Sequence, residues 1–281
     1  MRPAPFSYTR PANLHAALAA IADGALPLAG GQSLLQAMRL RSAEPAAVVD
    51  LNAVAELSRG HHWQASTLTI GALATHASIV AADDITQEMP WLCAAARALG
   101  DVQVRNLGTV LGNVCWADPR ANMLIALLAS DAIVVARHPA ESGERRIAIE
   151  HFVTGFREHA LDGALAVALE VPRRTAHGAY LEFSRQRQDL ALVNVCVVRG
   201  ERHARVAIGG IHRTPVRAVA FEELLAARPL HALPSATELA GLLDGLHLAP
   251  IEDAHGAPGY KCELARVLVM RALRAIAELA R

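Results

Sequence analysis

The chain has 281 residues, of which 53% are hydrophobic and 19% charged, and its 27 basic residues balance its 27 acidic ones. This length exceeds what one compact core needs and predicts two or three small ones. Because the formal net charge is zero and the arginines are scattered without interleaved aromatic residues, nucleic acid is not expected as a partner.

The sequence predicts neither an N-terminal signal region nor a membrane-spanning segment. The first six residues run into a polar stretch without a hydrophobic signal region. The apolar stretch at residues 124–136 is interrupted by Ser130 and Asp131, so no run reaches membrane-spanning length. We therefore expect a soluble, cytoplasmic chain that does not enter a membrane.

The first 57 residues predict a small α/β unit. Leu14, Leu18 and Ile21 recur at helical spacing and predict a helix over residues 13–22. A short buried strand is expected at residues 26–29 and leads into a Gly-Gly turn. A second helix over residues 34–40 and a strand over residues 47–51 complete the unit.

Residues 58–177 predict a second α/β unit. Alternation predicts a strand at residues 67–72, and helices are expected at residues 78–82 and 91–99. A second glycine-rich turn precedes an apolar helix at residues 121–129. Strands follow at residues 132–136 and 164–171, with a charged hairpin around Gly143 between them.

Residues 178–281 have a different order of predicted elements, with strands first and helices afterwards. Strands are expected at residues 190–198, 204–210 and 216–219, and helices at residues 221–227, 235–243 and 260–280. The last helix is strongly amphipathic. Runs of strands followed by helices predict an α+β domain.

Two polar segments within this apolar chain are candidates for ligand binding. The first is Ala29, Gly30, Gly31, Gln32, Ser33 and Leu34. It has neither the Lys of a nucleotide-hydrolase P-loop nor the three glycines of a Rossmann fingerprint. Adjacent glycines can take positive φ and turn backbone N–H groups toward an anion, whereas the alternative is a tight turn that binds nothing.

The second segment runs from Arg105 to Asn113 and on to Asp118. Gly108 and Gly112 bracket Thr109, whose hydroxyl could donate to a phosphate oxygen. Residues 118–122 predict a turn into a helix, with Asp118 or Asn122 as its cap. The alternative interpretation is two turns and a helix cap without a ligand.

At these positions the chain resembles the FAD-binding medium subunits of the molybdenum hydroxylases, the group of xanthine dehydrogenase and carbon monoxide dehydrogenase. That family carries a first loop like Ala-Gly-Gly-x-Ser/Asp-Leu and a second like Arg-Asn-x-Gly-Thr-x-Gly-Gly-Asn, followed by Ala-Asp-Pro. Both are present here in order, and further similar segments extend over nearly the whole chain, among them Ile70-Gly71-Ala72, Thr75-His76, Phe152 to Gly155 and Glu170-Val171-Pro172.

The resemblance implies a two-domain FAD-binding fold of the vanillyl-alcohol-oxidase (PCMH) type, followed by a C-terminal α+β domain of the CO dehydrogenase flavoprotein type. It implies that the first loop and the second loop close on the FAD pyrophosphate, with Asp118, Asn122 and Val167 nearby. The implied FAD-binding residues are Ala29, Gly30, Gly31, Gln32, Ser33, Leu34, Gly108, Thr109, Gly112, Asn113, Cys115, Asp118, Asn122, Val167 and Glu182.

Three positions depart from the family pattern. Leu111 replaces the first glycine before Asn113, so we expect that turn to be built with a side chain. Asn122 replaces an acid and keeps only its hydrogen-bonding capacity. The Lys expected near the flavin falls at Leu181 or Glu182, and Arg185 or Arg187 is a candidate substitute.

No metal site is expected. The cysteines, at positions 93, 115, 196 and 262, lack the close spacing typical of an iron–sulfur cluster or a structural zinc, and we expect buried free thiols. His61 and His62 lie side by side on an expected strand and point opposite ways, which disfavours a shared metal.

The resemblance implies an electron-transfer subunit that holds FAD non-covalently and takes electrons from the [2Fe-2S] clusters of a small partner subunit. A molybdenum-pterin cofactor on a large partner subunit oxidises the substrate, and the assembly is expected to be a dimer of heterotrimers. The alternatives are a self-contained flavin oxidoreductase and a flavin-free scaffold whose site has decayed. Flavin content and co-purifying chains discriminate among the three.

Overall fold

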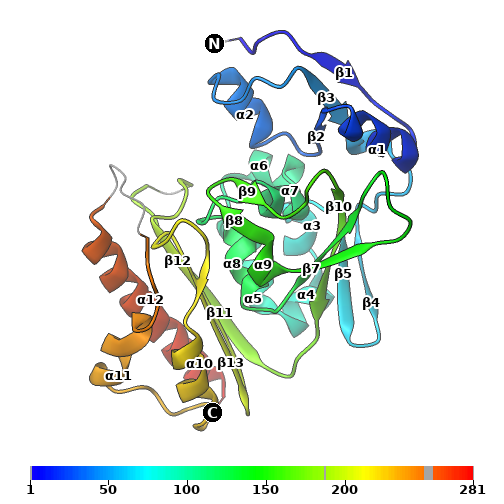
Figure 1. The fold of residues 1–281 in the computed structure, drawn as a ribbon. Coiled ribbons are helices and arrows are strands. Elements are labelled where there is room, and N and C mark those ends of the chain that lie inside the picture. Colours follow the sequence, from blue (N-terminus) through cyan, green and yellow to red (C-terminus); the bar gives the residue numbers. More distant parts are fainter. Residues whose placement is uncertain (1, 187, 250–255, 281) are drawn as a thin grey trace.

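The computed structural model describes residues 2–186, 188–249 and 256–280. In this part of the chain, strands form sheets of three, five, four and two members. Figure 1 shows a small amino-terminal unit above a central unit, with the carboxy-terminal sheet and helices beside the latter. This mixture of helices and strands confirms the α+β class.

The amino-terminal unit is a parallel sheet with the strand order β1-β3-β2. Its strands are β1 (Ser7–Thr9), β2 (Leu26–Leu28) and β3 (Ala47–Asp50), its helices are α1 (Leu14–Ala22) and α2 (Leu34–Arg39), and the 3-10 helix η1 (Leu51–Ala53) follows β3. Asn13 caps α1 by accepting from the N–H of Ala16. The expected burial at residues 26–29 is wrong, because β2 is an edge strand and Leu26 is 41% exposed.

The central unit is an antiparallel sheet with the order β4-β5-β10-β6-β7, covered by helices. Its strands are β4 (His61–Gln64), β5 (Thr67–Gly71), β6 (Ile133–Arg137), β7 (Arg145–Ala148) and β10 (Leu165–Pro172). Its helices are α3 (His76–Val80), α4 (Asp83–Glu88), α5 (Pro90–Ala98), α6 (Val102–Leu107), α7 (Val110–Cys115), α8 (Asn122–Leu128) and α9 (Ile149–Phe152). A hairpin of β8 (Val153–Gly155) and β9 (Glu158–His159) follows α9.

The carboxy-terminal unit is an antiparallel sheet with the order β11-β12-β13-β14. Its strands are β11 (His177–Phe183), β12 (Val193–Gly200), β13 (His203–Gly209) and β14 (Val216–Arg217). The helices α10 (Val219–Ala226), α11 (Ala236–Ala240) and α12 (Pro258–Leu279), with the 3-10 helix η2 (Gly241–Leu243), follow. All of β12 is buried, because α12 covers one face of this sheet and the central unit covers the other.

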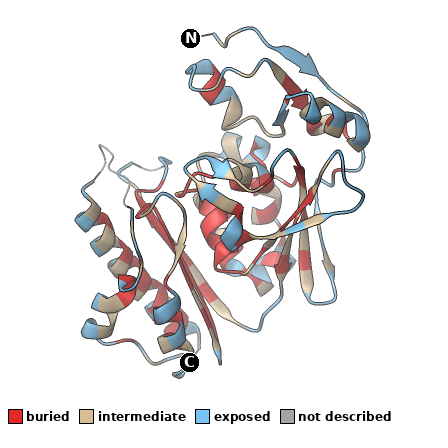
Figure 2. Cartoon of the chain, viewed as in Figure 1, coloured by how far each residue is buried: buried red, intermediate tan, exposed pale blue. Residues whose placement is uncertain are grey.

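Helix α8 lies where the central and carboxy-terminal units meet. It packs against α5 and α7 of the central unit and against β12 and β13 of the carboxy-terminal sheet. All seven of its residues are buried, and Figure 2 shows buried residues concentrated along this junction. A helix that is apolar all round after its first residue, Asn122, is expected to lie inside the protein, between two layers.

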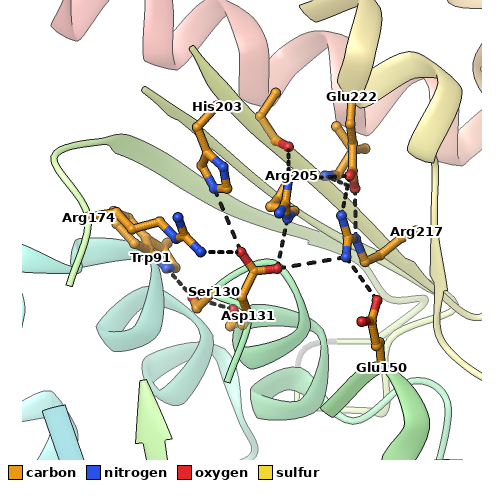
Figure 3. Close-up of polar contacts among 12 residues, drawn as sticks. Trp91, Ser130, Asp131, Glu150, Arg174, His203, Arg205, Arg217 and Glu222 are labelled. Carbon is orange, nitrogen blue, oxygen red and sulfur yellow. Dashed lines mark hydrogen bonds and ion pairs between the residues drawn. The ribbon is translucent and has the colours of Figure 1, made fainter. Parts of the chain in front are cut away.

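A charged network, here called the ionic cluster, joins the two units just after α8 (Figure 3). Its members are Asp131, Glu150, Arg174, His203, Arg205, Arg217 and Glu222. Asp131 accepts from Nε of Arg205 at 2.7 Å and from Nη2 of Arg174 at 2.9 Å. Arg217 donates to both Glu150 and Glu222 and thereby ties β14 to α9 and α10. Opposite charges therefore pair across the junction.

The sequence missed several elements that the structure contains. The segments of β4, α4, α6, α7 and β11 had no predicted counterpart as helix or strand. α4, α6 and α7 have only six residues each, so tertiary contacts rather than periodicity stabilise them. The three predicted strands of the last unit are present, joined by β11 at one edge.

Candidate functional site

The two polar segments are in direct contact in the folded chain. A Cβ atom placed on Gly30 would lie 2.1 Å from the backbone oxygen of Leu107 and 2.8 Å from Cα of Gly108. A Cβ on Gly108 would lie 3.5 Å from Cγ of Gln32. The glycines therefore allow two backbones to approach more closely than any side chain permits.

The first segment presents unused backbone donors. Within the described residues, the N–H groups of Gly30, Gly31, Gln32 and Ser33 donate to no protein acceptor. Gly31 has φ +71°, a conformation that favours glycine, and Nδ2 of Asn52 anchors the loop by donating to the oxygen of Ala29 at 2.9 Å. Consecutive free N–H groups in a fixed loop can donate to the oxygens of a pyrophosphate, so this loop fits FAD.

The second segment is not the expected glycine turn. Two short helices, α6 and α7, meet at Gly108 and Thr109, and neither Gly108 nor Gly112 has positive φ. The N–H of His76 donates to Gly108 and the N–H of Val110 donates to Ala74, which attaches this joint to the start of α3. Close packing, not an unusual backbone conformation, therefore explains these glycines.

The expectation that Leu111 would build a turn is wrong. Leu111 lies inside α7 and is buried in the core at 3% exposure. Thr109 caps this helix, since its hydroxyl oxygen accepts from the N–H of Gly112 at 3.1 Å. Two donors of Thr109 remain available to a ligand. They are the hydroxyl hydrogen and the backbone N–H, which has no acceptor among the described residues.

The expected cap of the next helix is also wrong. The N-cap of α8 is Ala121, which has no side-chain hydrogen bond, and Oδ1 of Asn113 instead accepts from the N–H of Met123 at 3.2 Å. Asp118 is 1% exposed and holds Arg120 through Nε at 3.0 Å and Nη2 at 3.1 Å. Asn113 thus links the second segment to α8, while the Asp118 carboxylate is engaged with a guanidinium.

Asn122 and Glu182 are brought together, although 60 positions separate them. Nδ2 of Asn122 donates to Oε2 of Glu182 at 2.9 Å, and the hydroxyl of Tyr180 donates to the same oxygen at 2.8 Å. Nδ2 of Asn194 donates to the Tyr180 oxygen at 3.1 Å and to the oxygen of Arg120 at 2.9 Å. We call these four residues, Asn122, Tyr180, Glu182 and Asn194, the amide–carboxyl cluster.

Burial raises the pKa of Glu182 above its ordinary value, and the hydrogen bonds from Tyr180 and Asn122 partly oppose that rise. Of the two candidate positions for the family's Lys, Leu181 packs against the other core on the opposite face of β11, whereas Glu182 faces α8. Arg185 is exposed and forms no ion pair with Glu182, and Arg187 lies outside the described residues.

Two further predicted residues lie apart from this arrangement. Val167 lines a cavity of about 660 Å³ between α1 and the central sheet, together with Ser58 and Gly71 and without any member of the two segments. Cys115 ends α7 as a free thiol, and burial raises its pKa to about 12, so it stays protonated.

His76 is a residue of this site to which the sequence assigned no role. Its side chain is 2% exposed, and its Nδ1 atom is buried without a hydrogen-bond partner. Burial and the Arg105 charge lower the pKa of His76 to about 4, so the ring is neutral at physiological pH. Its edge packs beneath Gly108, where Cδ2 would lie 3.2 Å from an added Cβ.

The comparisons with known proteins cover almost the whole chain. The family described as the FAD binding domain in molybdopterin dehydrogenase matches residues 4–174, and the CO dehydrogenase flavoprotein C-terminal domain matches residues 178–276. The chain belongs to the FAD-binding medium subunits of the molybdenum hydroxylases. This confirms both the resemblance and its fold.

Relatives of this medium subunit are parts of several oxidoreductases. It is 33% identical to the 6-hydroxypseudooxynicotine dehydrogenase complex subunit alpha of Paenarthrobacter nicotinovorans, over 97% of this chain and 95% of that protein. It is 31% identical to the glyceraldehyde dehydrogenase medium chain of Sulfolobus acidocaldarius, over 99% and 100%.

A solved carbon monoxide dehydrogenase from Hydrogenophaga pseudoflava, lacking the Mo-pyranopterin moiety, superposes with a TM-score of 0.92 at 30% identity and 100% coverage of both chains. The quinoline 2-oxidoreductase of Pseudomonas putida 86 gives a TM-score of 0.89 at 28% identity, covering 100% of this chain and 99% of that one.

Two negative findings apply to the described residues. No helix within them combines the length and hydrophobicity needed to cross a membrane. They also contain no group of three or more His, Cys, Asp or Glu side chains arranged to hold a metal ion.

Proposed function

We propose that this medium subunit carries electrons from the [2Fe-2S] clusters of a small partner subunit, through FAD, to an external acceptor. A large partner subunit with a molybdenum-pterin cofactor oxidises the substrate, and the cytoplasmic assembly is a dimer of heterotrimers. The observation that supports this most is the joint of the two segments, where free backbone N–H groups meet a close glycine contact.

The residues of this chain would bind and orient the cofactor. FAD supplies the chemistry of accepting and releasing electrons one or two at a time. We propose that Ala29 to Leu34 bind the pyrophosphate through backbone N–H groups, with Gly108, Thr109 and Gly112 closing on it from the second segment. Asn113, Asp118 and Asn122 order that segment and the start of α8. Cys115 ends α7 beside that segment, and Val167 lines the separate cavity between α1 and the central sheet.

We further propose that residues 1–57 and residues 58–177 are two domains that lie on either side of FAD. The contact between Gly30 and Leu107 supports it, because this contact joins the two units. Residues 178–281 form the third domain and contribute Glu182.

Purification of the tagged protein from its native host tests the assignment. We expect FAD that is released by acid precipitation, together with a small iron–sulfur chain and a large molybdenum chain. FAD without partner chains and with full substrate oxidation by the isolated chain would favour a self-contained flavin oxidoreductase. A colourless preparation would favour the flavin-free scaffold.

Substitution of Gly30 tests the site itself. Gly30→Ala should abolish FAD binding, because its Cβ would lie 2.1 Å from the oxygen of Leu107 and would push the two segments apart. Gly60→Ala is the matched control, since an added Cβ there meets nothing within 4 Å. Ser33→Ala should cost less, about 0.5–1.5 kcal/mol of FAD binding. Full flavin occupancy in Gly30→Ala would contradict the site.

A further inference from the structure

The amide–carboxyl cluster contains an acid, Glu182, that has no cationic partner in the part of the chain that the structure describes. Both donors to Glu182, Asn122 and Tyr180, are neutral and bind its Oε2 atom. No described residue donates to Oε1, and no described Lys, Arg or His forms an ion pair with this carboxyl. The side chain is half-buried, and the two hydrogen bonds that it accepts leave Oε1 without a donor among the described residues.

The groups facing this carboxyl from the neighbouring elements are few. Helix α8 contributes Asn122, strand β12 contributes Asn194 and the Cys196 thiol, and β11 itself contributes Tyr180. Burial raises the pKa of Cys196 and of Tyr180 well above the ordinary values, so both stay neutral. The nearby Asp118 and Arg120 form a pair with each other. Glu182 is therefore the group of this cluster that ionises in the ordinary pH range.

Hydrogen bonds connect Glu182 to the second segment. Glu182 accepts from Asn122, the residue after Asn122 donates to Asn113, and Asn113 lies in α7, which begins at the Thr109 cap. α8 is fully buried, so little mobile water or salt separates the carboxyl from the segment. A charge in such surroundings acts over longer distances than one in bulk water.

We propose that Glu182 is the electrostatic tuning residue of the FAD site: its charge lowers the midpoint potential of the bound flavin, and proton uptake by this carboxyl couples that potential to pH. The inference rests on the proposed function. A fixed negative charge opposes the gain of electrons by a nearby group. Protonation removes that charge, so the potential rises more steeply toward acid than it does without this carboxyl.

Redox titration against reference dyes tests the proposal in the purified complex, from about pH 5 to pH 9. Glu182→Gln keeps the shape and hydrogen-bonding capacity but removes the charge. We expect its flavin potential to be more positive than wild type at high pH, with a weaker dependence on pH. Glu88→Gln is the matched control, because Glu88 is paired with Arg173 on the surface, and it should leave the potential unchanged.

A second variant moves the potential the other way. Asn122→Asp adds a second carboxyl against Glu182, and we expect a potential below that of wild type at high pH. If Glu182→Gln does not retain FAD, the potential of Asn122→Asp tests the role of Glu182 instead. A wild-type protein without FAD would contradict the proposed function, whereas bound FAD with the wild-type potential and pH dependence in the variants would overturn this inference alone.

Discussion

The two ends of α8 join the same two units by different chemistry. At its start, the amide–carboxyl cluster uses neutral donors around one acid, Glu182. Beyond its end, the ionic cluster sets Asp131, Glu150 and Glu222 against three arginines. Paired charges largely cancel at a distance, whereas a lone carboxylate retains its field. The ionic cluster is therefore suited to attaching the two units, and the amide–carboxyl cluster is suited to tuning the FAD site.

The largest expected effect is loss of the central acid of the ionic cluster. Asp131→Asn keeps a residue that tolerates the observed φ of +52° but leaves the arginines without their shared carboxylate. We expect the free energy of unfolding to fall by about 3 kcal/mol, measured by urea denaturation. Asp84→Asn removes an exposed pair with His61 and should cost less than about 1 kcal/mol. Equal losses in the two variants would contradict an attachment role.

A smaller effect is expected at the other end of α8. Asn194→Ala removes the hydrogen bonds to Tyr180 and to the Arg120 oxygen from a side chain that is 0% exposed. We expect a loss of about 2 kcal/mol in the same denaturation experiment. Asn106→Ala, at an exposed position of α6, is the control and should change stability little. A loss in Asn194→Ala as small as in the control would show that this end contributes little attachment.

The two ends should also respond oppositely to pH. Burial, Arg205 and Arg174 lower the pKa of His203 below its ordinary 6.5, so the unfolded chain binds the proton more readily. Its contribution to stability is complete above about pH 6.5 and is lost as the pH falls. The raised pKa of Glu182 has the opposite sign, since its contribution is present below its ordinary value of 4.5 and is lost as the pH rises.

Thermal melting across this pH range, compared between wild type and variants, tests the contribution of His203 and carries the smallest expected effect. His203→Gln should lose less stability than wild type on acidification, whereas His151→Gln, at an exposed position, should follow wild type. Other titrating groups such as His76 are present in both proteins, so their contribution cancels when the melting temperature of His203→Gln is subtracted from that of wild type at each pH. Parallel curves for all three proteins would contradict the role of His203.

The sequence predicted the elements of the fold better than the roles within the site. The long amphipathic pattern ending the chain predicted α12, and the alternation at residues 67–72 predicted β5, because periodicity records which face is buried. The six-residue helices α6 and α7 were missed, since so short a helix depends on neighbours for its stability. For the same reason Leu111 was assigned to a turn that does not exist.

Family membership, the glycine positions and the acid at residue 182 were all legible in the sequence alone, because local residue types and their spacing carry them. Only the tertiary structure decided that Gly30 lies against Leu107, that Asn113 accepts from the first turn of α8 and that Glu182 accepts from Asn122. These contacts join residues on different elements, and their geometry follows from how buried helices and sheets pack. No local pattern of residues predicts such a contact, because each of the two residues fits its own helix, strand or loop equally well when the contact is absent.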